Sequence, residues 1–98
     1  MNSEIKEGVK GKILAVDDSS QSRNVLKSYL GDEGYTVITA EDGEEGLAVA
    51  LDQLPDVILL DVIMPKVDGY EACQRLKADE RTRFTPVLMI TSLEKVED

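Results

Sequence analysis

An apolar run ends in two adjacent carboxylates in the segment Lys12-Ile-Leu-Ala-Val-Asp-Asp18. Two later runs also end in side-chain oxygens: Val57-Ile-Leu-Leu-Asp61, and Pro86-Val-Leu-Met-Ile-Thr91 with Ser92 after it. Apolar runs without polar alternation are typical of parallel strands that are covered on both faces. Because open α/β sheets bind ligands at the carboxyl edge of their strands, we expect these oxygens to share one site.

Three of the strand-end residues are acidic: Asp17, Asp18 and Asp61. Carboxylates gathered at one place repel one another unless a cation or a proton joins them. Hard oxygen ligands select Mg²⁺, with Mn²⁺ as an alternative ion. Taken singly, Asp17, Asp18 or Ser19 could merely cap a helix, and Asp61 could be a turn residue. Their combination favours a divalent-metal site with a reactive aspartate.

The rest of the sequence alternates strands with helices. A helix is expected after Ser19 or Ser20, and two more begin at the capping pattern Asp-x-x-Glu. The expected strands are 13–16, 36–40, 57–60 and 87–90, and the helices start near residues 20, 42 and 68. Such alternation predicts an α/β fold with a doubly wound parallel sheet. Phosphate-binding glycine motifs are absent from the sequence, which argues against nucleotide and flavin binding.

Composition excludes several classes of function. The chain has 98 residues, enough for one domain, with 20 acidic and 11 basic residues and a net charge of −9. Direct nucleic-acid binding is not expected, since phosphate backbones require Lys and Arg. The chain has no histidine, so it cannot itself carry phosphohistidine. No apolar run is long enough to span a membrane, and a single Cys73 suits the cytoplasm.

The sequence resembles the receiver domain of two-component response regulators. The matching stretches are Lys12–Asp18, Ala40–Glu45, Pro55–Gly69 and Pro86–Ser92. The resemblance runs from Lys12 to the end of the chain, so we expect a polar leader over residues 1–11 and a receiver domain over 12–98. It implies a flavodoxin-like sheet of order 2-1-3-4-5.

The resemblance also implies a role for each residue of the site. Asp61 would be the phosphoacceptor. Asp17 and Asp18 would bind Mg²⁺ together with Asp61 and the backbone carbonyl of Ile63. Thr91 would be the switch hydroxyl, and Ser92 would contact the phosphoryl group.

The chain departs from the family pattern near its end. The fifth strand, with its lysine and aromatic switch position, and the last helix are not found in the sequence, and Lys95 lies too close to Thr91 to be that lysine. We therefore expect a C-terminally incomplete receiver domain. The strand 87–90 would then be an apolar edge, which predicts self-association through it or marginal stability.

The function expected from these residues is a phosphorylation-controlled signalling switch, not a turnover enzyme. A sensor histidine kinase or a phosphotransfer protein would be the partner, and its phosphohistidine would supply the phosphoryl group to Asp61. Two alternatives remain open at this point. One is a receiver-like docking module that never carries phosphate. The other is an aspartyl-phosphate phosphatase, although Asp61-Val-Ile63 lacks the second acid of such enzymes.

Overall fold

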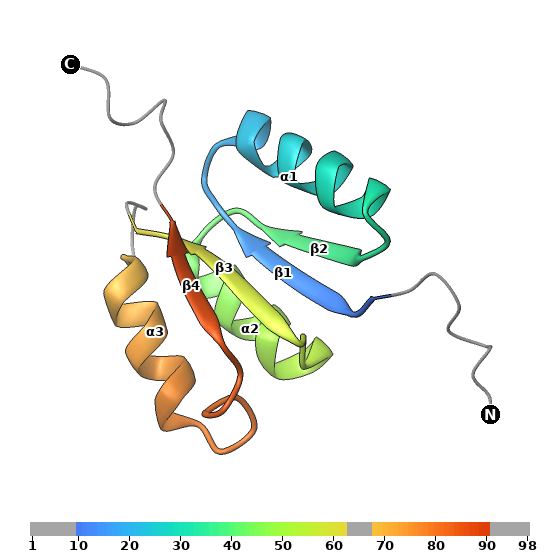
Figure 1. Ribbon diagram of the computed structural model, residues 1–98. Coiled ribbons are helices and arrows are strands. Elements are labelled where there is room, and N and C mark those ends of the chain that lie inside the picture. Colours follow the sequence, from blue (N-terminus) through green and yellow to red (C-terminus); the bar gives the residue numbers. More distant parts are fainter. Residues whose placement is uncertain (1–9, 63–67, 91–98) are drawn as a thin grey trace, which may run out of the picture.

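Strands and helices alternate through residues 10–62 and 68–90, which are the residues that the computed structural model describes. The elements in chain order are β1 (Lys12–Val16), α1 (Ser20–Asp32), β2 (Thr36–Ala40), α2 (Gly43–Gln53), β3 (Val57–Asp61), α3 (Gly69–Ala78) and β4 (Val87–Ile90). The predicted alternation is confirmed (Figure 1). Three predicted site residues, Ile63, Thr91 and Ser92, lie outside the described residues, as does most of the predicted leader.

The described strands form one parallel sheet of order β2-β1-β3-β4. Strand β1 is central: Val16 is in register with Ala40 of β2 and with Leu60 of β3. At the other side of β3, Asp61 is in register with Ile90 of β4. The predicted α/β class and the order 2-1-3-4 are confirmed. All the carboxyl ends of the strands therefore meet at one edge of the sheet.

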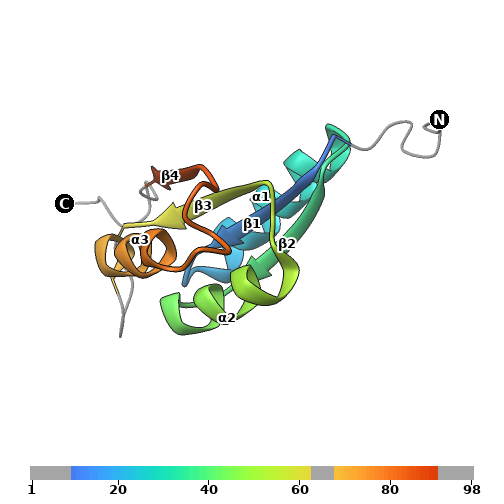
Figure 2. The same cartoon turned by 90° about the horizontal axis from the view of Figure 1, so that it is seen from below.

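The helices cover the sheet unequally. Helix α1 lies on one face, while α2 and α3 lie on the other (Figures 1 and 2). The core occupies the face under α2 and α3, and its buried members are Leu14, Val16, Ala40, Ala50, Ile58, Leu60, Ala72 and Leu76. Each large aliphatic side chain buried there contributes roughly 1.5–3 kcal/mol. The core holds β1 and β3 side by side, next to the acidic residues at their carboxyl ends.

Each helix begins at a capped residue close to that edge. The Ser19 hydroxyl accepts a hydrogen bond from the Ser22 N–H at 3.2 Å, which caps α1. Asp42 accepts from the Glu45 N–H at 2.8 Å, and Asp68 accepts from the Glu71 N–H at 2.8 Å. Both predicted Asp-x-x-Glu helix starts are therefore confirmed. The caps satisfy N–H groups that would otherwise lack partners in the first turn of each helix.

The apolar residues of α1 remain largely on the surface. No residue of α1 is buried, and Val25 and Tyr29 are both 64% exposed. In the described part of the chain, α1 packs mainly over β1 and β2. Leu88 of β4 is also exposed, at 55%. Within residues 10–62 and 68–90, no helix is long and apolar enough to cross a membrane.

Candidate functional site

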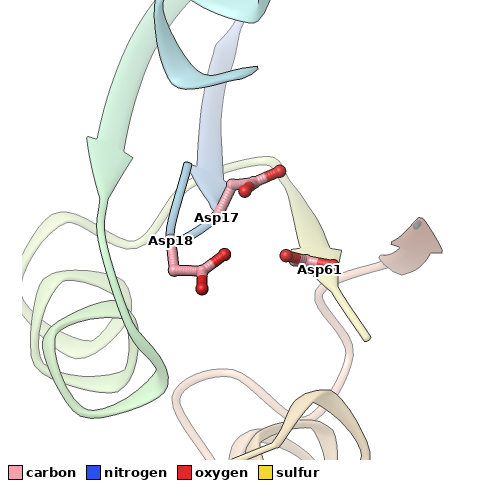
Figure 3. A group of neighbouring side chains, drawn as sticks. All are labelled: Asp17, Asp18 and Asp61. Carbon is pink, nitrogen blue, oxygen red and sulfur yellow. The ribbon is translucent and has the colours of Figure 1, made fainter. Parts of the chain in front are cut away.

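Three carboxylates converge at the carboxyl edge of the sheet. Asp17 and Asp18 follow β1, and Asp61 is the last residue of β3, the neighbouring strand. One carboxylate oxygen from each residue lies within 4.8 Å of the others (Figure 3). Asp61 is 0% exposed and Asp17 is 1% exposed, whereas Asp18 is exposed. The group is therefore backed by the sheet and open to solvent at Asp18.

Hydrogen bonds fix the loop that carries the first two carboxylates. The Asp17 N–H donates to the Ala40 carbonyl at 3.1 Å, which extends the pairing of β1 with β2 by one residue. One carboxylate oxygen of Asp17 accepts from the Ser19 N–H at 2.9 Å. Arg23 donates from Nη1 to the Asp17 carbonyl at 2.8 Å. Ser19 is the residue that caps α1, so capping alone does not account for Asp17 and Asp18.

The main chain around Asp61 is held by α3 and β4. The Val62 N–H donates to the Ile90 carbonyl at 2.9 Å, and the Gly69 N–H donates to the Val62 carbonyl at 3.1 Å. A Cβ on Gly69 would lie 2.6 Å from the Asp61 carbonyl oxygen. Such a contact is far too short, so a side chain at this position would collide with the main chain of Asp61. Only glycine lets α3 begin this close to Asp61.

The donor set fits a hard divalent cation. Carboxylate oxygens from three residues face one another, and two of those residues are almost completely buried. Burial strengthens the repulsion between like charges, because little water remains to screen them. Mg²⁺ and Mn²⁺ prefer such oxygen ligands. The three carboxylates therefore form an arrangement that a divalent cation fits.

Sequence and structure agree on most of the described site. The structure brings together Asp17, Asp18 and Asp61, as predicted. It also puts Ile90, the residue before Thr91, in register with Asp61. Arg23 was not predicted as part of the site. In the sequence, Arg23 is unusual only because it is a basic residue in the first turn of a helix, where acidic residues are favoured.

A doubly wound parallel sheet with an acidic group at its carboxyl edge defines a receiver-type α/β domain. A family model described as the response regulator receiver domain matches residues 13–98. The chain belongs to this family. Receiver domains of response regulators are phosphorylation-controlled signalling domains that interact with histidine kinases or phosphotransfer proteins, and they typically bind Mg²⁺ through acidic residues.

Two curated relatives illustrate the similarity. The DNA-binding dual master transcriptional regulator RpaA of Synechocystis sp. is 45% identical over 87 residues, which are 89% of this chain and 36% of that protein. The response regulator PleD of Caulobacter vibrioides is 48% identical over 83 residues, or 85% of this chain and 18% of that protein. The chain thus spans about a third or less of the length of these relatives.

Solved structures share the fold. The N-terminal domain of a response regulator receiver protein from Methanoculleus marisnigri JR1 aligns with a TM-score of 0.82 and 41% identity, covering 89% of this chain and 74% of that one. The chemotaxis response regulator CheY4 of Vibrio cholerae aligns with a TM-score of 0.78 and 45% identity, covering 86% and 72%. At these identities the similarity extends beyond the fold to the family.

Proposed function

We propose that this domain is a phosphorylation-controlled switch in which Asp61 accepts a phosphoryl group from the phosphohistidine of a sensor histidine kinase or a phosphotransfer protein. The observation that carries the proposal is the position of Asp61. Its carboxylate is fully buried against the sheet, yet one of its oxygens lies within 4.8 Å of oxygens of Asp17 and Asp18. Membership of the receiver family supports the same role.

In the proposed step, an oxygen of the Asp61 carboxylate attacks the phosphorus atom. The P–N bond breaks, its electron pair remains on the imidazole of the donor protein, and Asp61 becomes an acyl phosphate. Asp17, Asp18 and Asp61 would hold Mg²⁺, with the Ile63 carbonyl as a further ligand by family resemblance. The ion would neutralise negative charge on the transferring oxygens, the main requirement of phosphoryl transfer. Asp17 and Asp18 stay unmodified and keep their ligand role.

The new charge on Asp61 would then be read by the end of β4. By family resemblance, Thr91 would donate its hydroxyl to the phosphoryl group, and Ser92 would leave room for it. The register of Ile90 with Asp61 supports this, because it brings the end of β4 beside the acceptor. A bistable element biased by this charge is how such modifications act at a distance.

The proposal extends to the cellular setting. The domain would not turn over a substrate, and it would work in the cytoplasm, where a single cysteine stays reduced. Its net charge of −9 makes direct DNA contact by this domain unfavourable, although one relative is named a DNA-binding regulator.

We also propose self-association through β4, which is an edge of the described sheet and exposes Leu88.

Beryllofluoride, which mimics a phosphoryl group, tests the proposed site without a kinase. With Mg²⁺ present, it should raise the melting temperature of the domain and shift the amide resonances of Asp18 and Val62. Neither effect should occur in Asp61→Asn. A response to Mg²⁺ without a response to beryllofluoride would support the docking module instead, and no response to either would contradict the metal site.

A further inference from the structure

The contact of Arg23 with the acidic loop differs from the ion pairs that two other arginines form. Arg75 and Arg81 form ion pairs with carboxylates at the surface, with Glu71 at 2.8 Å and Asp79 at 3.0 Å. Arg23 is half-buried, and its guanidinium donates to the main-chain carbonyl of Asp17. Because Arg23 bonds to the main chain of Asp17, the carboxylate oxygens of Asp17 keep their other partners. The same hydrogen bond holds the positive charge of Arg23 close to this residue.

The position of Arg23 on α1 is electrostatically unfavourable in isolation. It lies in the first turn of the helix, whose N-terminus carries partial positive charge, and this turn contains no acidic residue. The surroundings offset the cost. The Arg23 side chain also lines a pocket with Glu41 and Glu45 at the end of β2. The Arg23 guanidinium therefore contacts the main chain of the acidic loop, and Arg23 shares a pocket with two glutamates.

We propose that Arg23 is a positioning residue of the acidic site, which holds the Asp17 main chain from α1 and supplies a resident positive charge that competes with the bound divalent cation. This inference rests on the proposed metal site. Without metal, the guanidinium reduces the repulsion among the three carboxylates. With metal, it repels the ion. The two cations stabilise the same negative charge, so each weakens the effect of the other.

Replacing Arg23 should therefore have opposite effects on stability and on metal affinity. In Arg23→Gln the metal-free domain should melt about 4–8 °C lower, the shift expected for about 1 kcal/mol in a domain of this size. Its dissociation constant for Mg²⁺ should fall by about three- to tenfold, because a nearby positive charge is gone. Saturating Mg²⁺ should then close most of the gap in melting temperature between variant and wild type.

Two further variants separate charge from structure. Arg23→Lys keeps the charge and should retain the Mg²⁺ dissociation constant of the wild type, even where it lowers the melting temperature. Lys27→Gln, one turn further along α1 at an exposed position, makes the same change in net charge. It should leave the dissociation constant within about twofold of the wild type, since solvent and salt screen exposed charges.

The measurements are calorimetric Mg²⁺ titrations and thermal melts of the full 98-residue chain, with and without saturating Mg²⁺. A variant Arg23→Gln that loses equal stability in both conditions, or binds Mg²⁺ as weakly as wild type or more weakly, overturns the inference. If this variant is unfolded without metal, refolding on Mg²⁺ addition supports the inference, and failure to refold contradicts it. A wild-type domain that does not bind Mg²⁺ overturns the proposed metal site itself, and the inference with it.

Discussion

Gly69 determines how closely α3 can begin against the end of β3. A Cβ at this position would lie 2.6 Å from the Asp61 carbonyl oxygen and 2.8 Å from the Val62 Cα. Main-chain atoms cannot rotate away as a flexible side chain can. Any larger residue must therefore shift either the helix or the main chain of the proposed phosphoacceptor.

We predict that Gly69→Ala destabilises the domain by about 1–3 kcal/mol, the usual cost of overpacking, and weakens its response to Mg²⁺. Urea denaturation with and without Mg²⁺ measures both effects. Gly31→Ala is the matched control, because a Cβ there meets nothing within 4 Å. On helix propensity alone, that control should be neutral or stabilised by up to about 1 kcal/mol. Equal behaviour of the two variants would show that the close approach is unimportant.

Asp18 is the exposed member of the acidic group. We predict that Asp18→Asn stabilises the metal-free domain, because it removes one of three mutually repelling charges, and abolishes most of the Mg²⁺-dependent rise in melting temperature. Thermal melts over an Mg²⁺ titration check both parts. Glu80→Gln, an exposed change of the same charge, should leave the Mg²⁺ response intact. A full Mg²⁺ response in Asp18→Asn would argue against a role for this residue in metal binding.

At the scale of the elements, the connection from α3 to β4 is fixed by one buried hydroxyl. Thr82 is fully buried, and its Oγ1 donates to the Leu76 carbonyl at 2.6 Å. Lys77 adds hydrogen bonds from Nζ to the carbonyls of Arg83 and Thr85. These contacts tie the end of α3 to the segment that leads into β4. They help to keep β4 in register with β3.

Thr82→Val keeps the shape of the side chain but removes the donor, so the Leu76 carbonyl loses its partner. We predict a loss of about 1–3 kcal/mol in the free energy of unfolding, the usual cost of leaving a buried polar group unsatisfied. Thr36→Val on β2, at an exposed position, is the control and should change stability little. Chemical denaturation of the two variants decides the point, and similar losses in both would contradict the assigned role of Thr82.

The elements were largely predictable because their signals are local. Asp42 and Asp68 sit three residues before a glutamate, and both cap helices as predicted. The exposure of α1 was not predictable from its spacing, since Val25 and Tyr29 recur at helical intervals and yet are both 64% exposed. The convergence of Asp17, Asp18 and Asp61 was predictable from the strand ends. Arg23 was not, because its contact depends on how the loop after β1 folds back on α1.

At the scale of the whole molecule, β4 is the edge of the described sheet through which we propose that the chain associates. Its Leu88 is 55% exposed, and α1 leaves Val25 and Tyr29 exposed as well. We predict that the chain forms concentration-dependent oligomers, and that Leu88→Lys shifts it toward the monomer, since a charge on an edge strand opposes pairing. Sedimentation velocity at several concentrations measures this. Leu54→Lys, another exposed leucine, is the control and should not alter association. A monomer at all concentrations would contradict association through β4.

The central claim is that Asp61 is the phosphoacceptor, and the most direct test is to locate the phosphoryl group. The domain is incubated with acetyl phosphate and Mg²⁺, the acyl phosphate is trapped by reduction, and peptides are mapped by mass spectrometry. The account predicts one labelled residue, Asp61, and loss of the label in Asp61→Asn or when Mg²⁺ is chelated. Label at another residue, or undiminished label in Asp61→Asn, would contradict it.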